Sequence, residues 1–501
     1  MSIHHHPAQK ARSSWSVVLL ALAIPVLFLV ALATMSPDKK SSSDLSPHTF
    51  PSMQSIELRI EPAAMAQLNA IREQALQIGV LRETDESWVE AELTEGDQDW
   101  PVELRLKGDW TDHIQDDRWS FRVEVKGDKA WRGLTDFSLM LPRRRDHLKE
   151  WLYHKALQAE GVLAPRYDFI RLAVNGEDWG PYAVEEHFTP QLLRRQGRPE
   201  GPILRIDETG MWEARVAALR DSAFPYMLTP FLEAAPVRPF KPKSILRDSA
   251  NLAEFHFADQ LMAEYRQGSG VPMDMIDLHR TASYYALTDL FGAYHSLIWH
   301  NRRYYFNPVS SQLEPVGYDG FSGQGEDTYI NGPIWGYRVD GWNPVGDYHE
   351  VMGDFPFRDD RFVREYFQKL SVFSDPAYLD HLLESVADEL HDRERFIRTG
   401  EWGYHFSRRF LEEGGSRIRT CLHDSFQMDH LLTKEAELSG MGQYLFVSNR
   451  NPLPAEVMGE NEVVHFLPAF SGKDTLWVPM WKVDQKMELK AWIPGLSPRT
   501  P

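Results

Sequence analysis

The sequence is poor in cysteine and in basic side chains, and both shortages exclude whole classes of protein. A single cysteine, Cys421, occurs in 501 residues, so the chain has no internal disulfide framework and no zinc site built from several cysteines. Only 54 Lys and Arg stand against 73 Asp and Glu, which gives a formal net charge of −19. Because phosphate backbones are bound by clustered Lys and Arg, we expect no nucleic-acid partner.

Internal repeats are also missing. No period of 20–50 residues recurs, which argues against a solenoid. Aromatic residues, in contrast, make up 12% of the chain, so we expect most of it to fold around a core. The length is sufficient for one large domain or for two to three ordinary ones.

One long hydrophobic run lies near the N-terminus. Residues 15–35 carry no charge over 21 positions, enough for a helix that rises about 1.5 Å per residue to cross a bilayer core. Lys10 and Arg12 precede it, so the pattern predicts a cytoplasmic tail at 1–14, a transmembrane anchor at 15–35 and an extracytoplasmic remainder. The alternative is a cleaved signal peptide, since Ala31-Leu32-Ala33 has the small-x-small form. The length of the run favours the anchor.

The rest of the chain alternates strand and helix patterns. Residues 36–52 are rich in serine and proline and are interpreted as a linker. Period-2 alternation predicts strands at 55–60, 102–107, 121–126, 167–174 and 179–185, with a tight turn at Asn175-Gly176. Helical patterns cover 62–80, 146–160, 252–299 and 360–433, with a helix start at Asp375-Pro376 and an interruption at Gly414-Gly415.

Alternation returns after about residue 440, which predicts a small β-rich segment at 436–501. The expected architecture is therefore α+β, with its main domain at 53–435. This domain is predicted to lie outside the cytoplasm. The N-terminal helix is predicted to anchor the protein in the membrane as a single-pass protein.

Three groups of residues, taken in order, are similar to one known family. These groups are Leu104-Arg105-Leu106-Lys107-Gly108, then Val174-Asn175-Gly176-Glu177 with Gly180-Pro181-Tyr182 and Glu186, then His300-Asn301 with Tyr318-Asp319. The ordered set, over about residues 53–435, resembles the spore-coat protein H (CotH) kinase family. The resemblance implies an atypical protein-kinase-like fold that transfers phosphate from ATP to secreted proteins.

The resemblance also implies roles for single residues. Lys107 and Glu186 are the expected nucleotide-binding residues, because kinases place a lysine on the phosphates and pair it with a glutamate or use the glutamate near metal. Asn301 and Asp319 are the expected ligands of Mg²⁺, with ATP as the other cofactor. Taken by themselves, a lysine at a strand end and a Glu-Glu pair are equally typical of a solvated surface.

For Asn301 and Asp319 the residues themselves supply an argument. Residues 302–306 and 313–318 predict the two strands of a hairpin, with a turn at 307–311. Antiparallel pairing then places Asn301 and Asp319 at the same open end, where Gly320 lets the chain turn sharply away. The alternative is a hairpin end capped by these two side chains without any ligand.

The sequence departs from the family pattern where catalysis would need a carboxylate. The family's second metal-site Asp would fall at Phe321, and its catalytic Asp near His295 or Ser296, and none of these is acidic. His295 in its neutral form is the candidate base, with Asp319 as the other catalytic candidate. Asp289, the nearest upstream carboxylate, is expected inside a helix.

The sequence leaves open the roles of Arg118 and of the Arg143-Arg144-Arg145 run. Arg118 stands near the place where the family often has a lysine, so an arginine would have to take that role. Arg143-Arg144-Arg145 either docks an anionic substrate or forms a solvated approach to the following helix, and we favour the solvated interpretation.

The function expected from the sequence is ATP- and metal-dependent phosphotransfer to a secreted or envelope protein by a membrane-anchored CotH-like kinase. The alternative is a catalytically weak pseudokinase that acts as a binding or scaffold subunit in cell-envelope assembly. Under both hypotheses the expected partners are a protein or envelope component and, through the N-terminal helix, the membrane.

Overall fold

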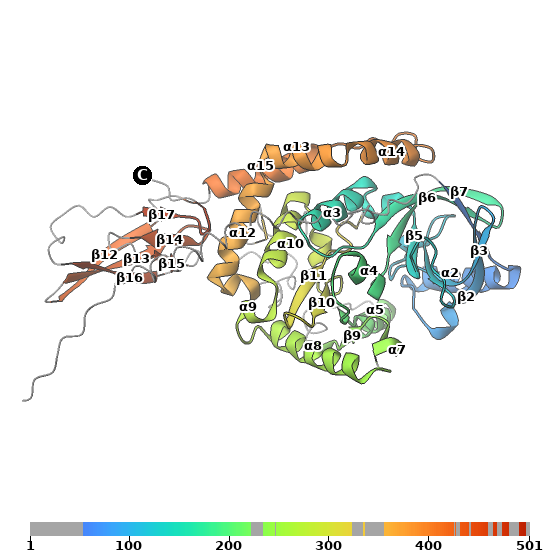
Figure 1. Ribbon diagram of the computed structural model, residues 1–501, viewed down its shortest axis with the longest axis horizontal. Helices are drawn as coiled ribbons and strands as arrows, with labels where there is room; N and C mark the ends of the chain where they lie inside the picture. The colour runs from blue at the N-terminus through green and yellow to red at the C-terminus, as the bar shows by residue number, and fades with distance from the viewer. Residues whose placement is uncertain are drawn as a thin grey trace, which may run out of the picture. The chain divides into compact units, whose positions relative to one another are not determined.

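The first strands of the described chain close into a barrel (Figure 1). The strand order is β1-β2-β3-β4-β5-β7-β6, and parallel pairing of β1 with β6 completes the closure. The barrel strands are β1 (Ser55–Arg59), β2 (Val89–Glu95), β3 (Gln98–Leu106), β4 (Phe121–Val125), β5 (Asp136–Met140), β6 (Tyr167–Val174) and β7 (Glu177–Glu186).

The computed structural model describes residues 54–221, 234–245, 247–322, 334–335, 355–424, 426, 431–439, 442–458, 464–467, 473–479 and 490–496.

The alternating sequence pattern explains why these segments form strands. In β3, Val102, Leu104 and Leu106 are buried, while the residues between them are partly exposed. Such alternation gives a strand one apolar face that must be covered, and the barrel covers it. The strand ends at Leu106 and therefore delivers Lys107 to the edge of the barrel.

The predicted turn between β6 and β7 is confirmed. Asn175 and Gly176 have φ of +50° and +84°, the left-handed geometry that a two-residue hairpin turn requires. The Asn175 side chain also accepts a hydrogen bond from Ile60 N at 2.7 Å and donates one to Ile60 O at 2.9 Å. The turn thus fixes the end of β1 as well as the hairpin.

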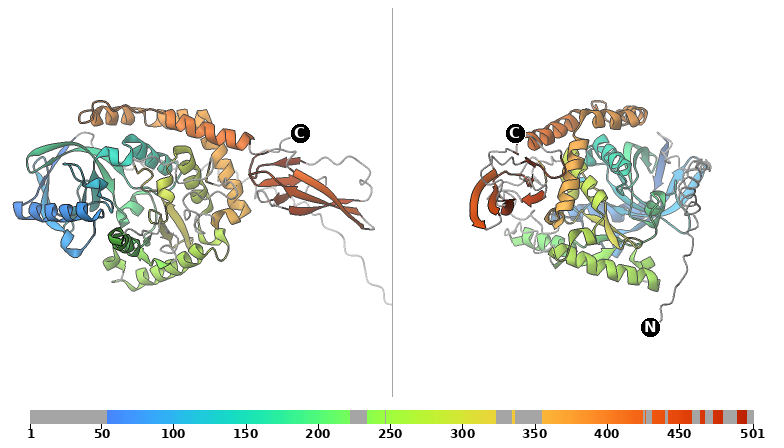
Figure 2. Two further views of the ribbon diagram at one scale, coloured as in Figure 1. Left: turned by 180° about the vertical axis from the view of Figure 1, so that it is seen from behind. Right: turned by 60° about the vertical axis from the view of Figure 1, so that its left-hand side comes forward.

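The second part of the chain surrounds a four-stranded sheet with helices. The strand order is β11-β10-β8-β9, and β10 pairs antiparallel with both neighbours. Helix α10 packs against α3, α12 and α15. Figure 2 shows the helices around this part from two further sides. The strands are β8 (Ile203–Ile206), β9 (Val237–Pro239), β10 (Arg303–Asn307) and β11 (Gln312–Val316).

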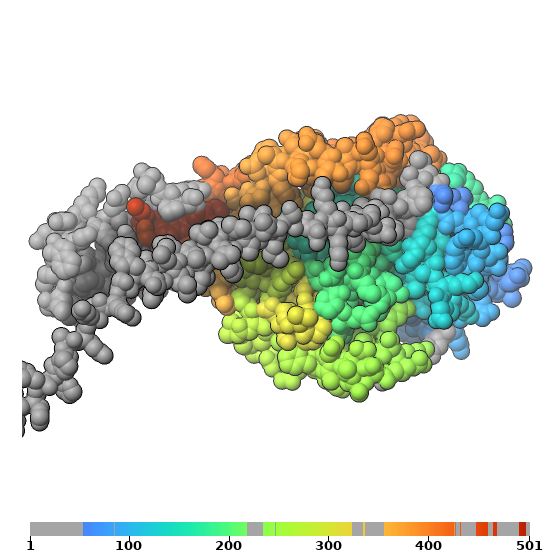
Figure 3. All heavy atoms as spheres, in the orientation of Figure 1, coloured from blue at the N-terminus to red at the C-terminus, as the bar shows by residue number. Residues whose placement is uncertain are grey.

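Helices α13 and α14 and the long helix α8 form part of the face drawn in Figure 3. The described helices are α2 (Pro62–Ile78), α3 (Leu148–Ala159), α4 (Pro190–Arg195), α5 (Thr209–Asp221), α7 (Pro242–Ile245), α8 (Ser249–Gln267), α9 (Pro272–Met275), α10 (Leu278–Phe291), α12 (Asp360–Phe373), α13 (Pro376–Ser385), α14 (Ala387–Ile397) and α15 (Arg409–Asp424). The predicted helix start at Asp375-Pro376 is confirmed, because the Asp375 carboxylate accepts a hydrogen bond from Ala377 N at 2.8 Å.

The interruption predicted at Gly414-Gly415 is wrong. Helix α15 runs through both glycines without a break. A side chain at Gly414 would overlap the backbone carbonyl of Leu290 in α10, so the glycine allows the two helices to approach closely. Helix packing, and not the chain's local preference, therefore decides the residue here.

Short strands dominate the described residues after position 430. They form two three-stranded sheets, of order β12-β13-β16 and β15-β14-β17, and the first strand begins at Leu431, ahead of the predicted boundary at 436. With the barrel and the helices, the described chain is α+β. The strands are β12 (Leu431–Ser439), β13 (Gly442–Asn449), β14 (Ala455–Met458), β15 (Val464–Leu467), β16 (Lys473–Pro479) and β17 (Lys490–Trp492).

The predicted cytoplasmic tail, anchor and linker at 1–14, 15–35 and 36–52 lie outside the described residues. Within the described ranges, no helix combines the length and the apolar character that crossing a membrane would need. The predicted main domain falls in a single compact unit, Ser52–Pro501.

The close contact at Gly414 gives the first testable prediction. Gly414→Ala should lower the free energy of unfolding by about 1–3 kcal/mol, because overpacking must move α15 away from α10. Gly210→Ala is the matched control: this glycine is also helical, and a Cβ there would meet nothing within 4 Å. Urea unfolding of both variants measures the difference, and equal stability of the two would contradict the packing argument.

Candidate functional site

A polar cleft of about 650 Å³ lies between the barrel and the second part of the chain. Four predicted site residues line it, namely Lys107, His295, Asn301 and Asp319, whereas the fifth, Glu186, does not. The lining comes from the edge of the barrel, from the turn at 142–145 and from the chain around the β10–β11 hairpin. The sequence therefore places most of its candidate residues in one cleft.

Lys107 reaches the cleft from the end of β3. Its ammonium lies 3.2 Å from Oε2 of Glu185 on β7, and both residues are buried. Gly108 follows with φ of +107°, and a Cβ there would lie 2.8 Å from the His113 ring. Only glycine fits this turn without strain, so the turn fixes the direction of the lysine.

The glutamate that Lys107 contacts is Glu185 and not the expected Glu186. Successive residues of a strand point to opposite faces, and Ser138, which pairs with Glu185 across β5 and β7, lines the cleft. Glu186 faces the other way and accepts hydrogen bonds from Arg195 at 2.5 Å and from Arg166 N at 2.9 Å. The glutamate that pairs with Lys107 is therefore Glu185, one residue before the predicted Glu186.

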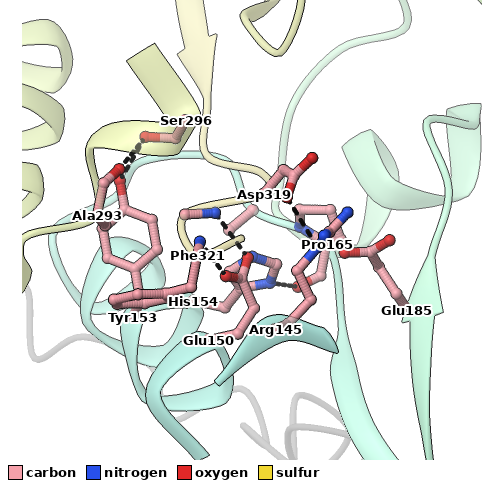
Figure 4. A network of polar contacts seen from close by, with 12 residues as sticks. Arg145, Glu150, Tyr153, His154, Pro165, Glu185, Ala293, Ser296, Asp319 and Phe321 are labelled. Atoms are coloured by element: carbon pink, nitrogen blue, oxygen red, sulfur yellow. Dashed lines mark hydrogen bonds and ion pairs between the residues drawn. The ribbon is translucent and has the colours of Figure 1, made fainter. Parts of the chain in front are cut away.

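Asp319 lies at the open end of the β10–β11 hairpin, as predicted, with φ of +57°. Its Oδ1 is 2.8 Å from Nε of Arg145 and 3.1 Å from Nδ1 of His295. Figure 4 shows Arg145 and Asp319 pointing toward one another. The third arginine of the Arg143–Arg145 run is thus buried against a carboxylate, so the solvated interpretation is wrong for this residue.

The surrounding charges determine the ionisation of this pair. Burial raises the pKa of Asp319, but the positive charge of Arg145, the hydrogen bond from His295 and the positive charge of Lys107 outweigh burial and hold the pKa well below its ordinary value. Burial lowers the pKa of Arg145, but the negative charge of Asp319, aided by Glu185 and Glu150, outweighs burial and raises the pKa above its ordinary value. Both groups are therefore charged at neutral pH.

A buried glutamate on α3 holds the chain that follows Asp319. The Glu150 carboxylate accepts hydrogen bonds from Gly320 N and Phe321 N, each at 3.2 Å (Figure 4). Gly320 packs closely on Tyr153, where a Cβ would come within 2.9 Å of the ring. The sharp turn predicted at Gly320 is not seen, because the positive φ is at Asp319 and the chain has no turn or bend at 317–322. Gly320 instead allows close packing on Tyr153. Glu150 is a positioning residue that sequence reasoning missed.

His154 completes this network one helical turn after Glu150. Its Nε2 is 2.8 Å from Glu150 Oε1, and its Nδ1 is 3.0 Å from the carbonyl oxygen of Pro165. Both ring nitrogens face oxygen acceptors, so the ring is best satisfied when doubly protonated. Burial lowers the pKa of His154, but the hydrogen bond and charge of Glu150 outweigh it and raise the pKa above its ordinary value.

Asn301 and His295 complete the floor of the cleft. The Asn301 amide donates a hydrogen bond to the carbonyl oxygen of His295 at 3.0 Å, and His295 Nδ1 lies 3.0 Å from the carbonyl oxygen of Asp319. Since the neighbours of Nδ1 on Asp319 are acceptors, the neutral ring carries its proton there and Nε2 is the nitrogen that accepts one. His295 thus links Asn301 to Asp319.

The family model of the CotH kinase protein matches residues 104–393, more than half of the chain. The chain belongs to the CotH kinase family. A search of curated proteins found no match for it. Membership in the CotH family implies a kinase-like fold, and it implies ATP and a divalent metal in general.

The residues at the expected CotH metal site do not fit a divalent cation as they are arranged. Asp319 Oδ1 already faces Arg145 and His295, and the Asn301 amide donates to a carbonyl group. The structure's described residues contain no group of three or more His, Cys, Asp or Glu placed to hold a metal ion. Phe321, at the position of the family's second Asp, packs on Tyr153 instead.

Asp289 is excluded as a substitute base. It is fully buried in α10, where it accepts hydrogen bonds from the hydroxyl groups of Tyr366 at 2.5 Å and Tyr294 at 3.0 Å and from Trp335 N at 2.7 Å. Burial raises its pKa to about 6 despite these bonds. The carboxylate does not line the cleft, so its role is structural.

Sequence reasoning missed the arginines of the cleft. Arg118 is exposed and does not line it, whereas Arg122 and Arg303 are buried and do. Arg122 pairs with the buried Asp136, and Arg303 lies over the rings of Phe188, Phe240 and Tyr318 at 5.2–5.7 Å. Both arginines lie within predicted strands, where alternation decides which face a residue takes.

The pKa of His154 gives a prediction about pH. A histidine with a raised pKa in the folded state contributes stability that is present below its unfolded pKa of about 6.5 and is lost as pH rises through the folded value. His154→Gln should therefore destabilise the protein more at pH 6 than at pH 9, measured by urea unfolding. The exposed His405, changed to Gln, is the control. A loss of stability that is equal at both pH values would show that the ring is neutral in the fold.

Proposed function

We propose that this CotH-family protein binds ATP in the cleft and acts mainly as a binding or scaffold subunit, a pseudokinase with weak phosphotransfer. The observation that supports this most is the buried Lys107–Glu185 ion pair at the floor of the cleft. In kinases such a pair presents a lysine to the nucleotide phosphates. The lysine is held in place before any ligand arrives, which lowers the entropic cost of binding.

The charge of the cleft supports an anionic ligand. Its described lining contains seven Lys and Arg against five Asp and Glu, although the whole chain has a net charge of −19. Arg122 and Arg303 lie with Lys107 close to His187, where their positive charges add to burial in lowering the pKa of this histidine well below its ordinary value. A triphosphate would be stabilised by the same charges.

Phosphotransfer to a hydroxyl group of a secreted or envelope protein is the second candidate function. Its support is the position of His295, whose Nδ1 is held by Asp319. In this reaction the acceptor oxygen forms a bond to the γ-phosphorus, the bond to the bridging oxygen of ADP breaks, and Nε2 takes the hydroxyl proton. Asp319, engaged with Arg145, would orient the imidazole.

The remaining parts of the proposal concern location. We propose that residues 15–35 anchor the protein as a single-pass membrane protein, with residues 53–435 as an extracytoplasmic kinase-like domain and 436–501 as a β-rich appendage. The uncharged run of 21 residues supports the anchor. The partner of either function is a protein or envelope component on that side of the membrane.

Lys107→Ala tests nucleotide binding. The lost charge-assisted hydrogen bond is worth about 1.5–3 kcal/mol, so the Kd for ATP should rise about 10- to 100-fold in calorimetry on the full chain. Lys126→Ala is a close control, because Lys126 also lies between the end of a strand and a glycine but is paired with Glu90 and Glu103 outside the cleft. Equal affinity in the two variants would remove Lys107 from the site.

Transfer of the labelled γ-phosphate of ATP separates the two candidate functions. A pseudokinase should show binding with slow or undetectable transfer. If transfer occurs, His295→Ala should reduce its rate by about 10²–10⁴-fold, the usual contribution of a general base. His405→Ala, at an exposed position, should leave the rate unchanged. Fast transfer that survives His295→Ala would mean that another group supplies the base.

A further inference from the structure

Arg145 is held against Asp319 by the backbone as well as by charge. It ends a short 3₁₀ helix, Pro142–Arg145, and the next two residues, Asp146 and His147, both have left-handed φ, of +50° and +56°. Asp146 is paired with Lys149 at 2.8 Å, and His147 with Glu401 at 2.7 Å. Two consecutive non-glycine residues in this region are unusual and persist only where the surrounding contacts fix them.

The Arg145–Asp319 ion pair is one of two that neutralise the charges on the floor of the cleft. On the cleft floor, Asp319 is paired with Arg145 and Glu185 with Lys107, and the exposed fraction of each of these side chains is 11% or less. A divalent cation on Asp319 would add two positive charges beside an arginine that cannot lose its proton. Arg145 would first have to leave a buried carboxylate, without which its own charge is unpaired.

We propose that Arg145 takes the place of a divalent cation on Asp319, so that the cleft binds ATP without metal. This inference rests on the proposed function, because it names the form of ATP that the same site accepts. A guanidinium is a fixed monovalent charge with several N–H donors, and it neutralises Asp319 without the ligand geometry that Mg²⁺ demands. Arg205 and Arg303, which also line the cleft, would stabilise the phosphates instead.

Titration calorimetry with ATP on the unmodified full chain is the first test. The Kd should change by less than about twofold between EDTA and excess Mg²⁺. A Kd at least tenfold lower with Mg²⁺ would overturn the inference and leave the proposed ATP binding intact. Absence of binding under both conditions would overturn the proposed function itself.

The second test uses Mn²⁺ alone, followed by electron paramagnetic resonance, and needs no nucleotide. The unmodified protein should not bind Mn²⁺ at this site, whereas Arg145→Ala exposes Asp319 and should bind it at least tenfold more tightly. The double variant Arg145→Ala, Asp319→Ala should lose the gained affinity. Arg143→Ala is the matched control, because this neighbouring arginine is 43% exposed, pairs with Asp116 and does not line the cleft.

The outcomes of the second test are equally decisive. Binding of Mn²⁺ by the unmodified protein that Asp319→Ala abolishes would show that Arg145 gives way to a cation, and the inference would fall. Near-ultraviolet circular dichroism checks that Arg145→Ala is folded. Should it not be, the comparison of EDTA with Mg²⁺ on the unmodified chain decides alone.

Discussion

The floor of the cleft depends on one buried carboxylate, that of Glu150. Through Gly320 N and Phe321 N it ties helix α3 to the chain that follows Asp319, and through His154 it ties the same helix to the chain just before β6. A fully buried charge is tolerated only where several hydrogen bonds stabilise it. Because Glu150 holds the two residues that follow Asp319, it also fixes where Asp319 meets Arg145 and His295, and so the chemistry of the cleft follows from this contact.

The distribution of charge explains how an acidic chain can hold an anion. A net charge of −19 describes the average surface, whereas the arginines and the lysine of the cleft are gathered from the barrel edge, the turn at 142–145 and β10. Residues far apart in the sequence contribute one or two charges each, and only the fold brings them together. Overall charge therefore argues against a long polyanion but not against a small one.

Patterns local in the sequence predicted the fold well. Alternation located the strands around Lys107 and the Asn175-Gly176 hairpin, and the hairpin argument placed Asn301 and Asp319 at one open end. The misses have tertiary causes. The glutamate beside Lys107 was misassigned by one position because the family register outweighed strand alternation, and Gly414 was misjudged because a close helix contact cannot be seen locally. Arg145 could not be assigned, since its partner Asp319 lies 174 positions further along the chain.

The central claim is that an arginine, and not a metal ion, neutralises Asp319 when ATP is bound. The most direct measurement is anomalous diffraction from crystals of the full chain grown with ATP and Mn²⁺. We predict phosphate density beside Lys107, an intact Arg145–Asp319 ion pair and no manganese peak at Asp319. A manganese peak coordinated by Asp319, with the Arg145 side chain displaced, would contradict the account.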